Sequence, residues 1–182
     1  ARPLRNDGER EWSLPLSIVI PEPQSGLRNP CPVSCNTRLA TMTDYVLRET
    51  KDLARDAVLG LYLANKWSSA AKPDRLMTAL GNSDTVVTAW APDPANGETL
   101  IGLGNALSDG ALVVYYPHLL VHPDWHGKGV GRAIIRHMQE RYAGFHQHAL
   151  IADAPAIGFY ERCGFTRAGD CQAMWIYAGG DG

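Results

Sequence analysis

The sequence predicts one α+β domain with a mostly antiparallel sheet. Two patterns support this prediction: apolar residues at helical spacing alternate with short β-branched runs, and three such runs follow one another with only turn residues between them. The chain has 182 residues, of which 45% are hydrophobic, which is enough to bury one ordinary core. The expected order is strand, two helices, three strands, helix, strand, helix and two strands.

The first elements are expected from residue 44 onward. A short strand is expected over 45–48, and a helix over 53–64, where apolar residues recur at helical spacing and Thr50 is a candidate cap. A second helix is expected to begin near Pro73, because proline suits the first helical turn, and to end at Gly81.

Three consecutive strands are expected in the middle of the chain, over 85–91, 100–107 and 111–122. The intervening segments 92–97 and 108–110 contain Asn-Gly and Asp-Gly pairs, which favour tight reversals. These strands therefore form an antiparallel meander.

The last third of the chain predicts a helix over 130–142, a strand over 149–151 and a helix over 156–162. Two further strands are expected within 165–177, interrupted at Gly169.

The first forty residues differ from the rest. Six of the twelve prolines precede residue 36, and only the run 17–20 is β-branched enough for an edge strand. We therefore expect a proline-rich N-terminal extension over 1–40 and the folded domain over 41–182.

Charge and composition exclude several classes of function. The chain has 17 basic and 19 acidic residues, a net charge of −2, and no basic run that would bind nucleic acid. No apolar run approaches the roughly 20 residues of a membrane span, and no signal peptide is evident. Four cysteines are too few for a disulfide scaffold, so we expect a cytoplasmic protein without nucleic-acid or membrane partners.

The segment 119–133 has the chemistry of an anion site. A strand leads through three alternating glycines, Gly127, Gly129 and Gly131, into a helix. Glycines let the backbone approach an oxyanion, and the free amides and dipole of a helix N-terminus favour its charge. The spacing matches neither the nucleotide-binding P-loop nor the dinucleotide fingerprint. A purely structural turn remains the alternative.

No metal site is expected. The histidines His118, His122 and His126 are spaced four apart, but Pro117 and Pro123 make one continuous helix through them implausible.

Two motifs resemble the GNAT N-acetyltransferase superfamily. The strand ending 119–123 (LLVHP) and the loop 126–131 (HGKGVG) resemble its acyl-CoA motif, with histidine where glutamine or arginine is usual. The later run 159–165 (FYERCGF) resembles its closing Phe-Tyr-x-x-x-Gly-Phe. The family's usual asparagine before the last helix is not evident within 152–156.

The resemblance implies a six- to seven-stranded, mostly antiparallel sheet with four helices, which splays open between its fourth and fifth strands around 115–122 and 148–153. It implies acetyl-CoA as cosubstrate, with the pantetheine arm in the gap and the pyrophosphate at the glycine loop. The implied cofactor contacts are Leu119, Leu120 and Val121 for pantetheine, and His126, Gly127, Lys128, Gly129, Val130, Gly131 and Arg132 for pyrophosphate.

Two residues are candidates for catalysis. Tyr160 occupies the position from which this family protonates the leaving thiolate, with a buried packing role as its alternative. His118 stands where the family places a base, because an ammonium must lose a proton before it can attack; a water route or simple packing are its alternatives.

Aromatic residues predict the acceptor. Tyr62, Trp67, Tyr116 and Trp175 fall on segments that wall the family's acceptor site, so we expect a small aryl- or alkylamine. For each of these aromatic residues, packing in the core or a dimer contact is the alternative. The segment 100–109 also resembles plant serotonin N-acetyltransferases. Acetylation of protein lysines or N-termini is one alternative, and a non-catalytic acyl-CoA-binding module is another. A homodimer is a further expectation, by analogy with the family.

Overall fold

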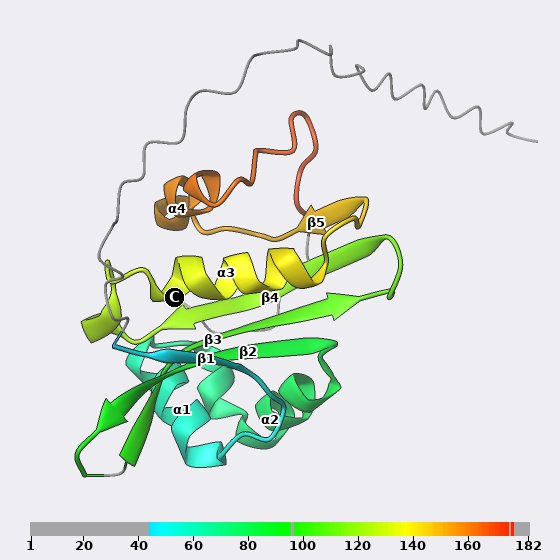
Figure 1. Cartoon of the computed structure of the whole chain (residues 1–182). Coiled ribbons are helices and arrows are strands. Elements are labelled where there is room, and N and C mark those ends of the chain that lie inside the picture. The colour runs from blue at the N-terminus through cyan, green and yellow to red at the C-terminus, as the bar shows by residue number, and fades with distance from the viewer. Residues whose placement is uncertain (1–43, 96, 175, 177–182) are drawn as a thin grey trace, which may run out of the picture. The chain divides into compact units, whose positions relative to one another are not determined.

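The structure, a computed structural model, describes residues 44–95, 97–174 and 176. It contains one mixed sheet whose strands lie in chain order (Figure 1). The strands are β1 (Val46–Glu49), β2 (Thr85–Asp93), β3 (Gly97–Ser108), β4 (Val113–Val121) and β5 (Gln147–Ala149). The α-helices are α1 (Arg55–Ala64), α2 (Pro73–Asn82), α3 (Val130–Arg141) and α4 (Ile157–Arg162), and short 3-10 turns cover Ser68–Ala71, Pro123–Trp125 and Ala154–Ala156.

Strands β1 to β4 pair antiparallel, whereas β5 pairs parallel to β4. The parallel pair follows from the connection between its strands, because α3 returns the chain to the end of the sheet from which β4 started. The predicted meander over 85–122 and the helices on either side of it are therefore confirmed.

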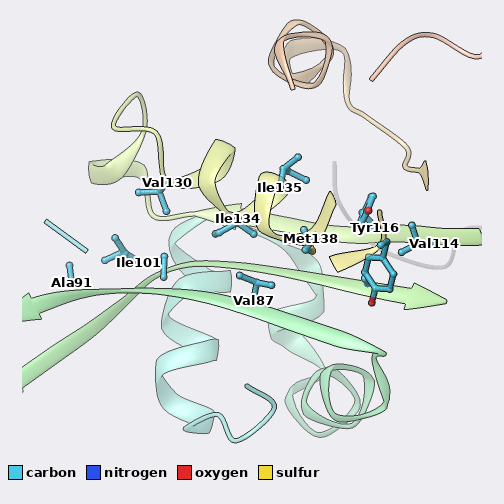
Figure 2. Close-up of a cluster of buried hydrophobic side chains, with 12 residues drawn as sticks. Val87, Ala91, Ile101, Val114, Tyr116, Val130, Ile134, Ile135 and Met138 are labelled. Atoms are coloured by element: carbon cyan, nitrogen blue, oxygen red, sulfur yellow. The ribbon is translucent and has the colours of Figure 1, made fainter. Parts of the chain in front are cut away.

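Helices cover both faces of the sheet. One buried cluster lies between the sheet and α3 and includes Ile134 and Met138 (Figure 2). A second cluster lies between the opposite face and the helix pair α1 and α2, and includes Val58 and Leu80. Strand β2 is buried on both faces from Thr85 to Ala89, which explains its continuous apolar and β-branched character.

Two glycines of β3 allow α3 to lie close to the sheet. A Cβ atom at Gly104 would lie 2.7 Å from Cγ2 of Ile134, and one at Gly102 would lie 2.9 Å from Cγ1 of Val130. A larger residue at either position would require α3 or its side chains to move. The glycines of β3 thus allow the short distance between α3 and the sheet.

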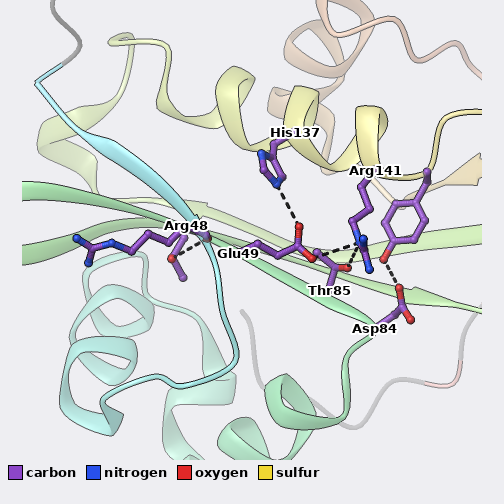
Figure 3. A network of polar contacts seen from close by, with 8 residues as sticks. Arg48, Glu49, Asp84, Thr85, His137 and Arg141 are labelled. Atoms are coloured by element: carbon purple, nitrogen blue, oxygen red, sulfur yellow. Dashed lines mark hydrogen bonds and ion pairs between the residues drawn. The ribbon is translucent and has the colours of Figure 1, made fainter.

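Polar contacts connect the C-terminal half of α3 to β1 (Figure 3). His137 donates from Nε2 to the Glu49 carboxylate at 3.2 Å, and Arg141 pairs with the same carboxylate at 3.2 Å. Arg141 also donates to Oγ1 of Thr85 at 3.1 Å. These side chains are partly exposed, so each pair adds little stability, but together they set the orientation of α3.

A β-bulge interrupts β4 at Pro117. Asn105 pairs with His118 and Leu107 pairs with Tyr115, so two residues of β4 lie opposite one residue of β3. Proline lacks the N–H that a regular ladder needs, and a bulge is one of the few sheet positions that tolerate it. The bulge therefore accommodates Pro117 inside β4.

The bulge reverses which side chains of β4 face α3. Before it, Val114 and Tyr116 belong to the cluster beneath α3; after it, Leu119 and Val121 pack there instead. The side chain of His118 consequently lies on the α1 face of the sheet, against Tyr62.

The sheet splays between β4 and β5, as predicted. Their pairing covers only three positions, from Val113 with Gln147 to Tyr115 with Ala149. Beyond Tyr115 the two strands are not paired, and the C-terminal half of β4 has no neighbouring strand on that side among the described residues. The open edge leads directly into the glycine loop.

Three details differ from the sequence-based expectation. The described residues form five strands rather than six or seven, because 165–174 contains no strand and 175 and 177 lie outside the described residues. Met174 and Ile176 are almost fully exposed and belong to neither buried cluster of the described residues. Thr50 does not cap α1, which begins at Arg55, and instead accepts a hydrogen bond from the Asp52 amide at 3.1 Å.

The domain boundary at residue 41 stays a prediction, since 1–43 lie outside the described residues, together with the run 17–20. Within the described part of the chain, no helix is long and apolar enough to cross a membrane.

Candidate active site

The glycine loop has a geometry that exposes backbone amides. Gly127 and Gly129 adopt positive φ angles of 76° and 85°, which L-residues rarely adopt, and a Cβ atom at either would have no neighbour within 4 Å. Gly129 is the N-cap of α3, and no side chain of the described residues caps this helix end. The first amides of α3, from Val130 to Arg132, therefore remain available for an anion.

The residues around the glycines fix the loop to the end of β4. Nε2 of His126 lies 2.8 Å from the carbonyl oxygen of Val121, and the ring of Trp125 contacts Tyr45 edge to face. Nζ of Lys128 lies 4.5 Å from the centroid of Trp125, a cation–π contact that places its charge beside the loop. His126, predicted as a cofactor contact, thus connects the loop to the strand.

The open edge of β4 presents two amides. The amide of His122 donates to the carbonyl of Ile101, which sets the alternation of the antiparallel ladder. By this alternation the N–H groups of Leu119 and Val121 point away from β3, toward the splay. The backbone of Leu120 faces β3 and its side chain is buried, so two of the three predicted strand contacts can meet a ligand through their N–H groups.

Helix α4 places Tyr160 next to the loop helix. A Cβ atom at Gly131 of α3 would lie only 3.3 Å from the ring of Phe159, so the two helices nearly touch. Nε2 of Gln139 on α3 donates to the carbonyl of Cys163 at 2.9 Å, which fixes the end of α4. Tyr160 packs edge to face against Phe159 and Phe165. Burial, with smaller contributions from Cys163 and Asp153, raises the pKa of Tyr160 to about 12.

His118 belongs to a compact group on the α1 face. The hydroxyl of Tyr62 lies 2.7 Å from Nδ1 of His118, and the ring of Trp67 meets both rings edge to face, with centroids 5.9 and 5.1 Å away. Burial lowers the pKa of His118 and raises that of Tyr62, so both side chains are neutral at pH 7. The structure therefore brings together three predicted site residues from α1, the following turn and β4.

The end of α1 aims Trp67 at this group. Lys66 has a positive φ of 58°, and the amide of Trp67 donates to the carbonyl of Tyr62 at 3.1 Å. This is the hydrogen-bond pattern of a Schellman motif, in which glycine usually occupies the left-handed position. A lysine in that conformation adds strain, and the turn directs the indole onto His118.

Tyr116, another predicted acceptor contact, lies outside this group. The hydroxyl of Tyr116 lies 2.8 Å from Nδ1 of His148, on the face beneath α3, because the bulge reverses the strand. Tyr116 is only 4% exposed and Tyr62 is fully buried. The acceptor contacts of Tyr62 and Tyr116 stay predictions; in the structure each hydroxyl lies against Nδ1 of a neighbouring histidine. Trp175 lies outside the described residues.

One supporting residue was missed by the sequence analysis. Asn105 is buried; its Oδ1 accepts from the amide of His118 at 3.2 Å, and its Nδ2 donates to Oγ of Ser83 at 2.8 Å. It bridges the bulge to the end of α2. The available signal was an asparagine inside an otherwise apolar strand, since a buried polar group needs partners.

Among the described residues, no group of three or more histidine, cysteine or acidic side chains is arranged to hold a metal ion. His122 accepts from the amide of Asp124 at its Nδ1 and so caps the short turn after β4.

Comparisons with known proteins agree with this geometry. A family model described as an acetyltransferase (GNAT) domain matches residues 89–167, from β2 through the loop to the end of the second motif. This part of the chain is a GNAT domain. A putative acetyltransferase from Deinococcus radiodurans superposes with a TM-score of 0.63 at 28% identity, covering 74% of this chain and 89% of that one.

Two further matches are an uncharacterized relative and a solved structure of lower sequence identity. The "uncharacterized N-acetyltransferase ycf52" of Pyropia yezoensis is 29% identical over 106 residues, which is 57% of this chain and 60% of the relative. The chain thus spans about three fifths of the length of that curated relative. An aminoglycoside N-acetyltransferase in complex with CoA shares the fold at 16% identity, with a TM-score of 0.55 over 73% of this chain and 93% of the other.

Proposed function

We propose that this GNAT chain is an acetyl-CoA-dependent N-acetyltransferase that acts by direct attack of a primary amine. The observation that supports it most is a pair of sites with free amides, the N–H groups of Leu119 and Val121 at the open edge of β4 and the uncapped N-terminus of α3 that follows the glycine loop. Such a pair suits an extended amide-bearing arm that ends in a pyrophosphate.

The residues present fit CoA. One of the N–H groups of Leu119 and Val121 can donate to a carbonyl of pantetheine as an added strand would, which leaves the other for the acetyl carbonyl oxygen. Positive φ at Gly127 and Gly129 leaves open space above the loop, where a diphosphate can approach the backbone. Lys128 and Arg132 supply local positive charge in a chain whose net charge is −2.

The reaction needs a bond exchange at the acetyl carbon. The amine nitrogen forms the C–N bond to this carbon, the carbonyl oxygen gains charge transiently, and the C–S bond breaks. Of the two protons that an ammonium substrate loses, one goes to solvent and one ends on the sulfur. A backbone amide at the splay, that of Leu119 or Val121, can stabilise the charged oxygen.

Tyr160 assists the leaving sulfur chiefly as a hydrogen-bond donor. Its pKa of about 12 keeps the phenol protonated at neutral pH. Full transfer to a thiolate whose pKa is near 8.5 would cost about 5 kcal/mol, at about 1.4 kcal/mol per pKa unit. A donated hydrogen bond stabilises the developing charge without that cost, and solvent can supply the final proton.

The acceptor is proposed to be a small aryl- or alkylamine. Trp67 is partly exposed beside His118 and offers an aromatic wall, and the group is neutral at pH 7. A neutral aromatic wall favours an apolar amine over a polycation. Trp67→Ala is expected to raise KM for arylalkylamines more than for short alkylamines.

Two matched variants test the binding site. Gly129→Glu places a bulky negative charge at the helix N-cap, and Gly144→Glu places the same residue at another open, positive-φ glycine (92°) beyond the opposite end of α3. Both carry similar backbone strain. Calorimetric titration with CoA is expected to show affinity lost in the Gly129 variant and kept in the Gly144 variant; equal affinities would place the diphosphate elsewhere.

Release of free CoA across a panel of amines tests the reaction. We expect turnover with at least one primary amine, and a kcat about 10- to 1000-fold lower in Tyr160→Phe with unchanged CoA affinity. Unchanged kcat in this variant would remove Tyr160 from the mechanism.

A further inference from the structure

We propose that Tyr62 is a positioning residue that keeps the proton of His118 on Nε2, so that His118 meets the reactants as a hydrogen-bond donor rather than as the base. The inference rests on the proposed acetyl transfer for its catalytic part only. The tautomer itself can be measured in the free protein.

The contact between the two side chains is direct and enclosed. The Tyr62 hydroxyl lies 2.7 Å from Nδ1 of His118, and the whole Tyr62 residue is 0% exposed. The ring of Trp67 packs edge to face on both. Nδ1 is therefore occupied, and Nε2 is the ring nitrogen left to meet a substrate.

The direction of this hydrogen bond follows from what the Tyr62 hydroxyl can donate to. Among the described residues, Nδ1 of His118 is the acceptor within reach of its hydrogen. A buried O–H without an acceptor is strongly disfavoured. Burial also raises the pKa of Tyr62, so the phenol keeps its hydrogen at neutral pH. Tyr62 therefore donates, and Nδ1 carries no proton.

The neutral ring of His118 then has its single proton on Nε2. Burial lowers the pKa of His118, which keeps the ring neutral at pH 7. An Nε2–H group can donate but cannot accept a proton. To act as a base through Nε2, the ring would need its proton on Nδ1 instead. This Nδ1–H tautomer leaves the hydroxyl hydrogen of Tyr62 without an acceptor, so its population should be at least about tenfold lower than that of the Nε2–H tautomer.

A donor at this position has a clear use. His118 directly precedes Leu119, whose amide faces the splay, and Asn105 fixes the intervening backbone by accepting from the His118 amide. The acetyl carbonyl oxygen is the reacting atom that gains negative charge during attack. Nε2–H of His118 can donate to this oxygen in addition to the backbone, while solvent takes the amine proton.

Nitrogen-15 NMR of the imidazoles tests the tautomer without any substrate. We expect His118, assigned by its loss in His118→Gln, to show a protonated Nε2 and an unprotonated Nδ1, and to become a mixture of tautomers in Tyr62→Phe. Tyr116→Phe is the matched control, because its hydroxyl contacts His148 in the same way on the other face; it should leave His118 unchanged. A proton on Nδ1 in the wild type, or no change in Tyr62→Phe, overturns the proposal.

Two substitutions of His118 test its use as a donor. Glutamine places an amide N–H near the position of Nε2, whereas glutamate offers a base without a donor. We expect kcat/KM within about tenfold of the wild type in His118→Gln and a loss of about 100-fold or more in His118→Glu. The opposite order makes His118 the base. If the wild type acetylates no amine, the proposed function fails, and the NMR result still decides the tautomer.

Discussion

Gly104→Ala tests how closely α3 must lie on the sheet. The added Cβ would lie 2.7 Å from Cγ2 of Ile134 and 2.9 Å from Cε of Met138. Ordinary carbon contacts are about 3.5–4.0 Å, so α3 or its side chains must move by about 1 Å. Met138 is flexible, but the γ-methyl of a β-branched isoleucine is not. Overpacking of this kind costs about 1–3 kcal/mol.

Urea unfolding measures this cost against a matched control. Gly60→Ala adds the same methyl at an exposed position of α1, where nothing lies within 4 Å, and should stabilise by about 0.5–1 kcal/mol. With m near 1–3 kcal/mol per M, the midpoint of Gly104→Ala should fall by about 1 M while that of Gly60→Ala rises. Equal or greater stability in Gly104→Ala would refute the close packing of α3.

Three further predictions concern other parts of the fold. Because burial lowers the pKa of His118, the unfolded chain binds more protons than the folded chain below about pH 6.5. The contribution of neutral His118 to the free energy of unfolding should therefore be full above that pH and fall as the pH decreases through the lowered pKa. Thermal melts of His118→Gln at several pH values should lack this loss of stability. Lys66→Gly relieves a positive φ and should raise the unfolding free energy by about 1 kcal/mol, measured in urea; a loss would show that the lysine side chain stabilises the turn. Tyr142→Phe removes a hydrogen bond of 2.5 Å to Asp84 and should lower the melting temperature by a few degrees, whereas Tyr115→Phe should not.

Local patterns were sufficient to predict most of the elements. The helices over 73–82 and 130–142 were predicted within one residue, since proline, glycine and apolar spacing mark their ends. The splay between the fourth and fifth strands was expected from the family resemblance, and the three-position pairing of β4 with β5 agrees with it.

Contacts across the fold could not be predicted in the same way. Strict alternation would place Tyr116 and His118 on one face, but the extra residue of the bulge separates them, and its position is set by pairing with β3. The partnership of Tyr62 with His118 joins residues 56 positions apart, and no local pattern encodes it. The segment 165–174 was expected to contribute strands but contains none. An apolar run forms a strand only where another strand pairs with it, and its local pattern does not show whether such a partner exists.

Acetyl transfer itself is the most direct test of the account. Wild-type protein with acetyl-CoA and a panel of primary amines should yield free CoA and N-acetylated amine in equal amounts, and Gly129→Glu should yield neither. Tight CoA binding at the α3 N-terminus with no amine acetylated would contradict the account and identify the chain as a non-catalytic acyl-CoA-binding module.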